Sequence, residues 1–255
     1  MGTALPGDAR SAVSGTEFYQ LQGGGRLAFR YNPGAGPALV FLPGYMSDMA
    51  GSKAAAVFAW AEAQGRACLL FDYSGCGESE GDFAGGTLSR WRDEVTALIA
   101  AQCAGPVVLV GSSMGGWLML LVALAMPERV AALVGIAAAP EFTDWGFSAA
   151  QKAQLARGET LFEPNPYGPE PTPTYAAFWQ DGQAQRLLGG EIALDCPVRL
   201  LHGQSDSDVP WETALRLAKA LRSGDVQVTL VKDGDHRLSR DCDIAVLLAV
   251  LSDLP

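Results

Sequence analysis

The sequence predicts an α/β fold with a mostly parallel sheet flanked by helices, and three observations predict it. Apolar stretches of strand length alternate with stretches of helix length along most of the chain, which is typical of βαβ units around a parallel sheet. The chain has 255 residues, an ordinary length for one α/β domain. Because 49% of the residues are hydrophobic and 18% are charged, there is ample material for a packed core.

The expected elements follow in a regular order up to residue 140 and again from residue 197. Residues 18–31 are expected to form two short strands around a glycine turn, and residues 37–42 suit a strand buried on both faces. Further helices and strands are expected over residues 51–64, 67–71, 87–102, 107–110, 114–126, 130–136, 198–201, 210–222, 226–231 and 244–251. The sequence therefore predicts one core formed by residues 1–140 and 197–255.

The segment of residues 141–196 breaks this alternation. Five prolines fall within residues 164–173, which argues against a sheet strand through that stretch. The segment is also rich in aromatic residues: Phe142, Trp145, Phe147, Phe162, Tyr167, Tyr175, Phe178 and Trp179. Two interpretations of the segment stay open: an irregular insertion with a small core of its own, and a lid over an apolar pocket. The two interpretations are compatible. We treat the segment as a lid or cap insertion and expect Trp145, Phe178 and Trp179 to contact the substrate.

Charge and hydropathy argue against several classes of protein. A formal net charge of −10 would repel phosphate backbones and anionic lipid surfaces, so we expect no nucleic-acid partner. The longest apolar run, residues 117–126, is too short to span a bilayer, and residues 1–10 lack the order of a signal peptide. We therefore expect a cytoplasmic protein without a membrane span. The five scattered cysteines lack CxxC spacing, which argues against a disulfide framework and a zinc site.

Residues 111–115, Gly-Ser-Ser-Met-Gly, match the G-x-S-x-G pattern. In this pattern a serine occupies a sharp turn from a strand into a helix, so that its hydroxyl stands clear of the backbone. The match lies between an expected strand and an expected helix, as the turn requires. Side chains at Gly111 and Gly115 would crowd that turn. The spacing predicts Ser113, and not Ser112, as a nucleophile.

A serine hydroxyl needs a base within hydrogen-bond reach, most often a histidine held by a carboxylate. The chain has two histidines, of which His202 ends an expected strand and is interpreted as structural. His236 follows the last expected strand and leaves room for an acid before it, in the order serine, acid, histidine. Asp206 and Asp208 are both candidate acids in the loop after residues 198–201. Asp235 is interpreted as a solvated loop residue, because adjacent side chains rarely orient an imidazole.

The oxyanion that forms on attack needs two preorganised backbone N–H donors. One donor comes from the residue after the nucleophile, which is Met114, and the other from the loop after an earlier strand of the sheet. By position, Tyr45 in the loop after residues 37–42 is the second donor. A shift of this donor by one residue stays open.

Taken together, these motifs resemble the α/β-hydrolase superfamily. The matching segments are residues 43–45, 71–75, 111–117, 201–203, Asp206 with residues 209–210, and residues 235–237. Within the superfamily the set is similar to the branch of the mitochondrial palmitoyl-protein thioesterase that also hydrolyses acyl glucuronides. The resemblance implies an eight-stranded sheet, a triad of Ser113, His236 and Asp206, no metal and no organic cofactor. The family spacing H-G-x-x-D-x-x-V-P favours Asp206 over Asp208, which then is a candidate N-cap of the next helix.

The sequence thus predicts a serine hydrolase that cleaves small-molecule carboxylic esters or thioesters through an acyl-serine intermediate. A peptidase-like or acyl-transfer activity on the same triad stays open, as does a catalytically silent binding module. Residues 141–196 match the family least, and the fold serves many acyl groups. Acyl preference, natural substrate and oligomeric state are therefore not predicted.

Overall fold

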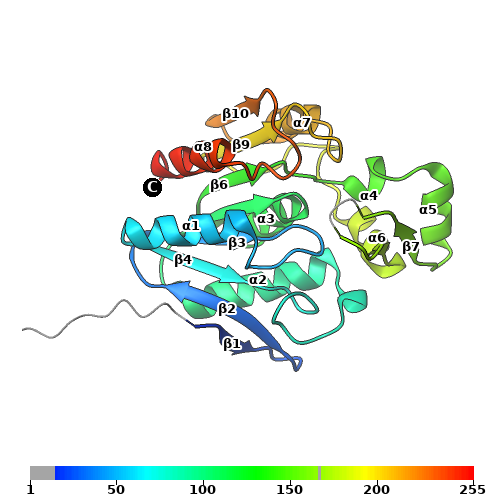
Figure 1. The fold of residues 1–255 in the computed structure, drawn as a ribbon, viewed down its shortest axis with the longest axis horizontal. Coiled ribbons are helices and arrows are strands. Elements are labelled where there is room, and N and C mark those ends of the chain that lie inside the picture. Colours follow the sequence, from blue (N-terminus) through cyan, green and yellow to red (C-terminus); the bar gives the residue numbers. More distant parts are fainter. Residues whose placement is uncertain (1–14, 166–167) are drawn as a thin grey trace, which may run out of the picture.

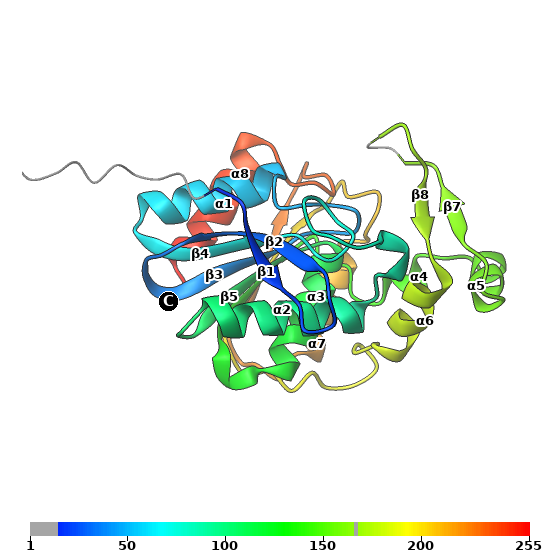
Figure 2. The same ribbon diagram turned by 90° about the horizontal axis from the view of Figure 1, so that it is seen from below.

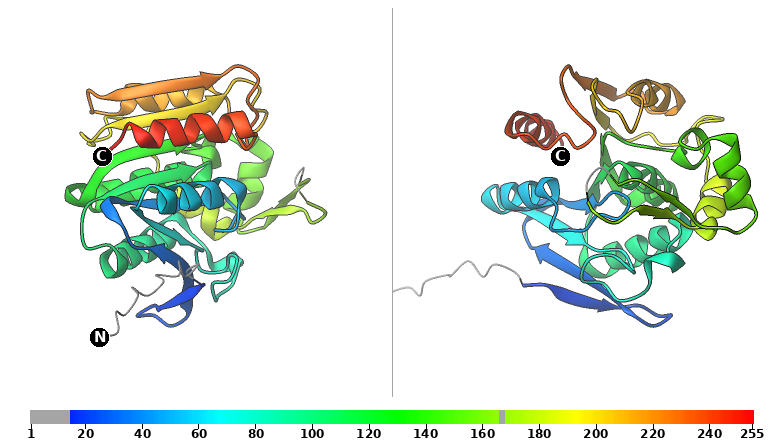
Figure 3. Two further views of the ribbon diagram at one scale, coloured as in Figure 1. Left: turned by 60° about the vertical axis from the view of Figure 1, so that its left-hand side comes forward. Right: turned by 45° about the vertical axis from the view of Figure 1, so that its right-hand side comes forward.

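A computed structural model of the chain describes residues 15–165 and 168–255. Residues 1–10 and Tyr167, on which two of the expectations above draw, lie outside the described residues. Eight strands form one sheet in the order β1-β2-β4-β3-β5-β6-β9-β10, which runs from β10 (orange) to β1 (blue) in the left panel of Figure 3. The predicted eight-stranded sheet is confirmed.

Parallel pairing brings the ends of several strands to one edge of this sheet. β1 (Glu17–Gln20) and β2 (Arg26–Asn32) form the antiparallel hairpin expected at the glycine turn, and β2 pairs antiparallel with β4 (Arg66–Phe71). All other neighbours in the sheet pair parallel: β4 with β3 (Ala35–Leu42), followed by β5 (Val107–Ser112), β6 (Val130–Ile136), β9 (Val198–Gly203) and β10 (Val226–Val231). The carboxyl ends of these strands therefore share one edge.

Helices cover both faces of the sheet, as Figure 2 shows. One face carries α1 (Ser52–Ala63) and α8 (Asp241–Ser252), and the other carries α2 (Leu88–Gln102), α3 (Met114–Ala125) and α7 (Glu212–Ala220). Two short 3₁₀ helices are η1 (Phe83–Gly85) and η2 (Pro127–Arg129). Since side chains alternate along a strand, each face has its own buried apolar cluster.

The start of α7 corrects one expectation. The helix begins at Glu212, and its N-cap residue is Trp211. Asp208 therefore lies too far before the helix to be its N-cap. The loop between β9 and α7 instead leaves Asp208 on the wall of a cavity.

The described residues between 142 and 184 lie beyond the carboxyl edge of the sheet, on the right of Figure 1, and residues 185–196 lead back to the start of β9. The elements of this segment are α4 (Phe142–Trp145), α5 (Ala149–Ala156), β7 (Leu161–Glu163), β8 (Thr172–Thr174) and α6 (Ala176–Ala184). Phe147, Leu155 and Leu161 form a small buried cluster of their own. One of the two interpretations of this segment, an insertion with its own core, thus describes its packing.

The end of the proline-rich stretch differs from the sequence expectation. β8 contains Pro173, which lies opposite Phe162 in an antiparallel pairing with β7. In a two-stranded ribbon each strand has one unpaired side, so a missing N–H on that side costs no ladder hydrogen bond. The expectation that no strand runs through residues 164–173 is therefore wrong at its last residues.

Within residues 15–165 and 168–255, no helix is both long enough and apolar enough to cross a bilayer.

Candidate active site

Ser113 lies on a strained turn between β5 and α3, with φ 54° and ψ −118°. Its N–H donates to the carbonyl of Ile136 at 2.9 Å, so the neighbouring strand β6 holds the turn. A Cβ at Gly111 would overlap the carbonyl of Gly115, and a Cβ at Gly115 would overlap that of Leu42. The turn therefore needs glycine at both positions, and it presents the serine hydroxyl above the sheet edge.

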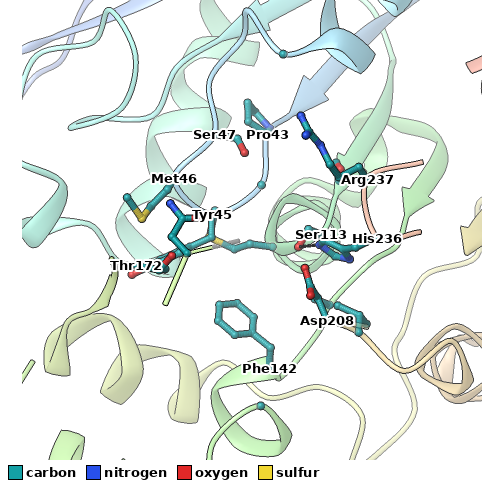
Figure 4. Close-up of a pocket in the computed structure, with 18 of the residues that line it drawn as sticks. Pro43, Tyr45, Met46, Ser47, Ser113, Phe142, Thr172, Asp208, His236 and Arg237 are labelled. Carbon is teal, nitrogen blue, oxygen red and sulfur yellow. Dashed lines mark hydrogen bonds between the residues drawn. The ribbon is translucent and has the colours of Figure 1, made fainter. Parts of the chain in front are cut away.

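The structure brings together Ser113, His236 and Asp206, which follow β5, β10 and β9. His236 Nε2 lies 3.0 Å from Ser113 Oγ, and His236 Nδ1 lies 2.9 Å from Asp206 Oδ2. An ionised carboxylate can only accept, so Nδ1 carries the imidazole proton and Nε2 can accept the hydroxyl proton. Figure 4 shows Ser113 and His236 side by side on the cavity wall. A hydroxyl, an imidazole and a carboxylate are thus connected in sequence by two contacts.

Main-chain hydrogen bonds hold the loop of the acid against the loop of the histidine. The N–H of Ser205 donates to the carbonyl of Gly234, and the N–H of Gln204 donates to that of Val231, both at 2.9 Å. These bonds join the residues just after β9 to those just after β10. The distance between acid and base is thus set by the backbone.

Four donors surround the carboxylate of Asp206. Its Oδ1 accepts from the N–H groups of Asp208 and Val209, each at 2.8 Å. Its Oδ2 accepts from His236 and also from Nε2 of His202, at 3.1 Å. Burial alone would raise the pKa of Asp206, but the hydrogen bonds from both histidines outweigh burial and hold that pKa well below its usual range. The acid is therefore ionised at neutral pH.

The other acidic residues considered in the sequence analysis, Asp208 and Asp235, lie on the loops that carry Asp206 and His236. Asp208 lines the cavity, and its Oδ1 accepts from the hydroxyl of Ser207 at 3.2 Å. Asp235 is exposed and accepts the N–H of Leu238 at 3.0 Å, as expected of a loop acid. Sequence reasoning missed the contact of His202 with Asp206. Their spacing of four residues across the end of β9 is the only signal that could have suggested it.

Met114 and Tyr45, the expected oxyanion donors, both line the cavity. Met114 is the first residue of α3, where N–H groups have no intrahelical acceptor. The N–H of Ser47 donates to the carbonyl of Gly44 at 3.1 Å and closes a turn, in which Met46 has φ 57°. That bond does not use the N–H of Tyr45. The backbone at both positions is thus compatible with donation to a bound oxygen.

The side chain of Tyr45 joins the loop after β3 to the 141–196 segment. Its hydroxyl donates to the carbonyl of Pro173 at 2.9 Å. Its ring lies 5.0 Å from that of Phe83 and 4.8 Å from that of Phe178, between ring centroids. Burial raises the pKa of Tyr45 well above its usual value. The hydroxyl therefore stays protonated and serves as a donor.

A cavity of about 720 Å³ opens onto Ser113 and His236. One wall comes from the loops at the sheet edge. The 141–196 segment supplies another wall, lined by Phe142, Trp145, Gly146, Phe147, Glu163, Pro164, Asn165, Thr172 and Thr174. The cavity is therefore shared between the core and the segment.

The three expected substrate-contact residues lie in different surroundings. Trp145 lines the cavity. Phe178 is 1% exposed and packs in the core, 5.8 Å from the ring of Trp91, and Trp179 donates from Nε1 to the carbonyl of Thr143 at 2.9 Å. Neither is among the cavity-lining residues in the described part of the chain. Phe178 and Trp179 thus pack behind the wall, whereas Phe142 and Phe147, which the sequence analysis did not single out as contact residues, line the cavity.

Charged side chains also line the cavity. Lys53 and Arg237 line it, as do Asp48, Glu163 and Asp208. The ammonium of Lys53 donates to the carbonyl oxygen of Arg237. Burial lowers the pKa of Lys53 to about 8, with a further contribution from Arg237. In residues 15–165 and 168–255, no three His, Cys, Asp or Glu side chains group so that they could hold a metal ion.

Comparisons with known proteins identify the family of the chain. Residues 39–248 match the model of the alpha/beta hydrolase family. The chain is 39% identical over 232 residues to the mitochondrial palmitoyl-protein thioesterase ABHD10 of Homo sapiens, covering 89% of this chain and 76% of that protein. For the Mus musculus protein the identity is 41% over 233 residues, covering 89% and 78%. The solved structure of mouse alpha/beta hydrolase domain-containing protein 10 superposes with a TM-score of 0.88 at 36% identity, covering 94% of this chain and 98% of the mouse chain.

Proposed function

The chain belongs to the alpha/beta hydrolase family, and we propose that it is a serine hydrolase of carboxylic esters and thioesters. The observation that carries the proposal is the chain of two contacts, 3.0 Å from Ser113 Oγ to His236 Nε2 and 2.9 Å from His236 Nδ1 to Asp206 Oδ2. A serine attacks a carbonyl carbon only when a base takes its proton, and this arrangement supplies the base. The thioesterase names of the relatives support including thioesters in the substrate class.

In the proposed reaction Ser113 Oγ attacks the acyl carbon while its proton passes to His236 Nε2. The negative charge on the carbonyl oxygen is stabilised by the N–H groups of Met114 and Tyr45. The imidazolium then donates its proton to the leaving alcohol or thiol as the bond to the acyl carbon breaks. Water then attacks the acyl carbon of the acyl-serine while His236 Nε2 takes a proton from it. The imidazolium donates that proton to Ser113 Oγ as the acyl–oxygen bond breaks and the acid is released. Asp206 stays ionised throughout and stabilises the imidazolium.

We further propose that residues 141–196 act as a lid that selects the acyl group. The support is their position: they supply a wall of the cavity opposite the loops of the sheet edge, with Phe142, Trp145 and Phe147 as its large apolar side chains. Small-molecule sites are typically apolar with few polar groups near the reacting atoms.

The proposal is tested by labelling with a fluorophosphonate, which reacts with an activated serine, and by turnover of acyl ester and thioester series. Ser113→Ala should abolish labelling and lower kcat by roughly 10³-fold or more. Ser112→Ala is the matched control and should retain labelling, since Ser112 is the last residue of β5 and precedes the turn. Failure of the wild-type protein to label would favour a silent binding module instead. Turnover of aminoacyl amides, or transfer to added alcohols in place of water, would shift the assignment to a peptidase or acyltransferase.

The expected cytoplasmic location stays a prediction. The relatives carry the word mitochondrial in their names, so the two compartments are the alternatives to compare. Expression of the complete natural protein followed by cell fractionation would distinguish them.

A further inference from the structure

His202 lies next to the proposed triad, and the reaction described above does not use it. It is the penultimate residue of β9, and its side chain is fully buried. Nε2 lies 3.1 Å from Oδ2 of Asp206 and 3.1 Å from the carbonyl oxygen of Val209. Its Nδ1 is buried and has no hydrogen-bond partner among the described residues.

These contacts determine the protonation of the ring. A carboxylate and a carbonyl can only accept, so Nε2 of His202 must carry a proton. A second proton on Nδ1 would be buried without an acceptor, which is unfavourable. His202 is therefore a neutral imidazole with its proton on Nε2. As a neutral donor it holds the carboxylate without adding a positive charge that would oppose the imidazolium of His236.

We propose that His202 is a positioning residue of the triad, whose Nε2–H holds Oδ2 of Asp206 in line with Nδ1–H of His236. This inference rests on the proposed hydrolase function. The two main-chain donors reach only Oδ1, so they leave the direction of Oδ2 to the side chains around it. Among the described residues, the side chains that form hydrogen bonds with Oδ2 are those of His202 and His236. Of these, His236 must change its charge during turnover, whereas His202 can stay fixed.

The second contact of His202 supports the same role. The Nε2–H group of His202 donates to both Oδ2 of Asp206 and the carbonyl of Val209. It thereby connects two positions of the loop that follows β9. The loop is thereby held against the end of β9. A residue that only filled the core would need no donor at this position.

The test compares His202→Leu, which removes the donor and keeps apolar bulk, with His202→Gln, whose side-chain amide supplies a donor at similar reach. We expect His202→Leu to lower kcat by about 10- to 100-fold, as for loss of a hydrogen bond to a charged group. KM should change little, because His202 is not among the residues that line the cavity. His202→Gln should recover most of the loss. Wild-type kcat in His202→Leu, or equal loss in both variants at equal thermal stability, would overturn the proposal.

The pH dependence of kcat/KM is a readout that a purely structural role would not move. Without the donor, Oδ2 attracts the proton on His236 more strongly, so the base becomes protonated at higher pH. The acid limb of the profile should therefore move to higher pH in His202→Leu and stay in place in His202→Gln. The other charged groups that line the cavity are the same in both variants: Asp48, Lys53, Glu163, Asp208 and Arg237. An unmoved acid limb in His202→Leu would contradict the proposal.

A measurement on the wild-type protein keeps the inference testable if a variant does not fold. Histidine ¹⁵N NMR at neutral pH should show His202 protonated at Nε2 and unprotonated at Nδ1. Protonation at Nδ1 would overturn the proposed role. The Ser113→Ala variant separates this inference from the function on which it rests. An active Ser113→Ala would contradict the hydrolase proposal itself, whereas an inactive Ser113→Ala beside a fully active His202→Leu would overturn only the role of His202.

Discussion

The carboxyl edge of the sheet and the 141–196 segment meet at one cavity but are held in different ways. At the sheet edge, main-chain hydrogen bonds set the positions of the proposed catalytic residues, such as that from Ser113 N–H to Ile136 and that from Ser205 N–H to Gly234. Hydrogen bonds of side chains connect the segment to the core. Asp181 accepts from Ser89, and Trp117 donates to the carbonyl of Gln185. Tyr45 donates to the carbonyl of Pro173.

This difference separates chemistry from selectivity. A main-chain hydrogen bond survives most substitutions, so the backbone of the proposed triad persists when most side chains elsewhere change. The carboxylate of Asp206, which His202 also contacts, is the exception. A side-chain tie is lost by one substitution, so the wall that the segment contributes can change with little effect on the reacting groups. We therefore expect substitutions at the sheet edge to act on kcat and substitutions in the segment to act on acyl preference.

The largest expected effect tests the sheet edge. Asp206→Asn should lower kcat by about 10²- to 10⁴-fold, because an amide group facing His236 Nδ1 favours the wrong imidazole tautomer. Steady-state kinetics with a short acyl ester would measure it. Asp208→Asn, on the same loop and at the cavity wall, is the matched control, and we expect a change of less than about 10-fold. If the control lost more activity than Asp206→Asn, the acid role would pass to Asp208.

The next effect tests the wall of the segment. Each methylene that Phe142, Trp145 or Phe147 buries should improve kcat/KM by at most about fourfold, equivalent to about 0.8 kcal/mol. Replacing one of them by alanine should flatten the dependence on acyl-chain length, while acetyl substrates keep their rate because they reach Ser113 without the wall. A series of acyl esters of increasing length measures this.

Phe178→Leu and Trp179→Phe are the controls for the wall. Both side chains pack behind the cavity, so these changes should lower the thermal midpoint and leave the chain-length profile in place. Should Phe178→Leu flatten the profile as strongly as Trp145→Ala, the separation between packing and substrate contact inside the segment would be abandoned.

A smaller effect is expected where the two regions join. Tyr45→Phe removes the hydrogen bond to Pro173, worth about 1 kcal/mol, and keeps the ring in its aromatic surroundings. We expect kcat/KM to fall about fivefold for long acyl chains and to stay unchanged for acetyl substrates. An equal decrease in kcat/KM for long acyl chains and for acetyl substrates would instead show that the hydrogen bond to Pro173 orients the N–H of Tyr45 toward the reacting oxygen.

The smallest effect concerns stability against pH. Since burial lowers the pKa of Lys53 to about 8 from 10.5, the unfolded chain binds more protons than the folded chain between these values. The contribution of Lys53 to the free energy of unfolding therefore rises with pH in this window, and solvent screening keeps it small because the side chain is only half-buried. Urea titrations of wild type and Lys53→Met between pH 7.5 and about 10.5 should diverge with this sign. A constant difference between the two proteins would contradict the prediction.

Local sequence patterns were sufficient to predict the proposed nucleophile and the strands of the sheet. Ser113 could be chosen over Ser112 because it lies midway between Gly111 and Gly115, and this spacing is encoded within a single turn. The strands of the sheet could be placed because a buried strand needs a continuous apolar run, whatever surrounds it. His236 could be chosen over His202 from chain order alone, but the contact of His202 with Asp206 could not be foreseen, since it depends on how the acid loop turns back over β9.

The composition of residues 141–196 predicted an irregular, aromatic-rich segment and could not rank its aromatic side chains. In a helix, neighbouring residues point about 100° apart, so the orientation of α4 and α6 decides which rings reach the cavity and which reach the core. That orientation comes from ties to distant residues, such as Asp181 to Ser89 and Tyr45 to Pro173. The sequence by itself thus determined the fold class, the turn at Ser113 and the choice of His236, because short-range spacing, burial periodicity and chain order encode them. The choice of Asp206 over Asp208 came from the resemblance to the family. Only the tertiary structure decided the cavity wall and the shared carboxylate, because both consist of contacts between segments far apart along the chain.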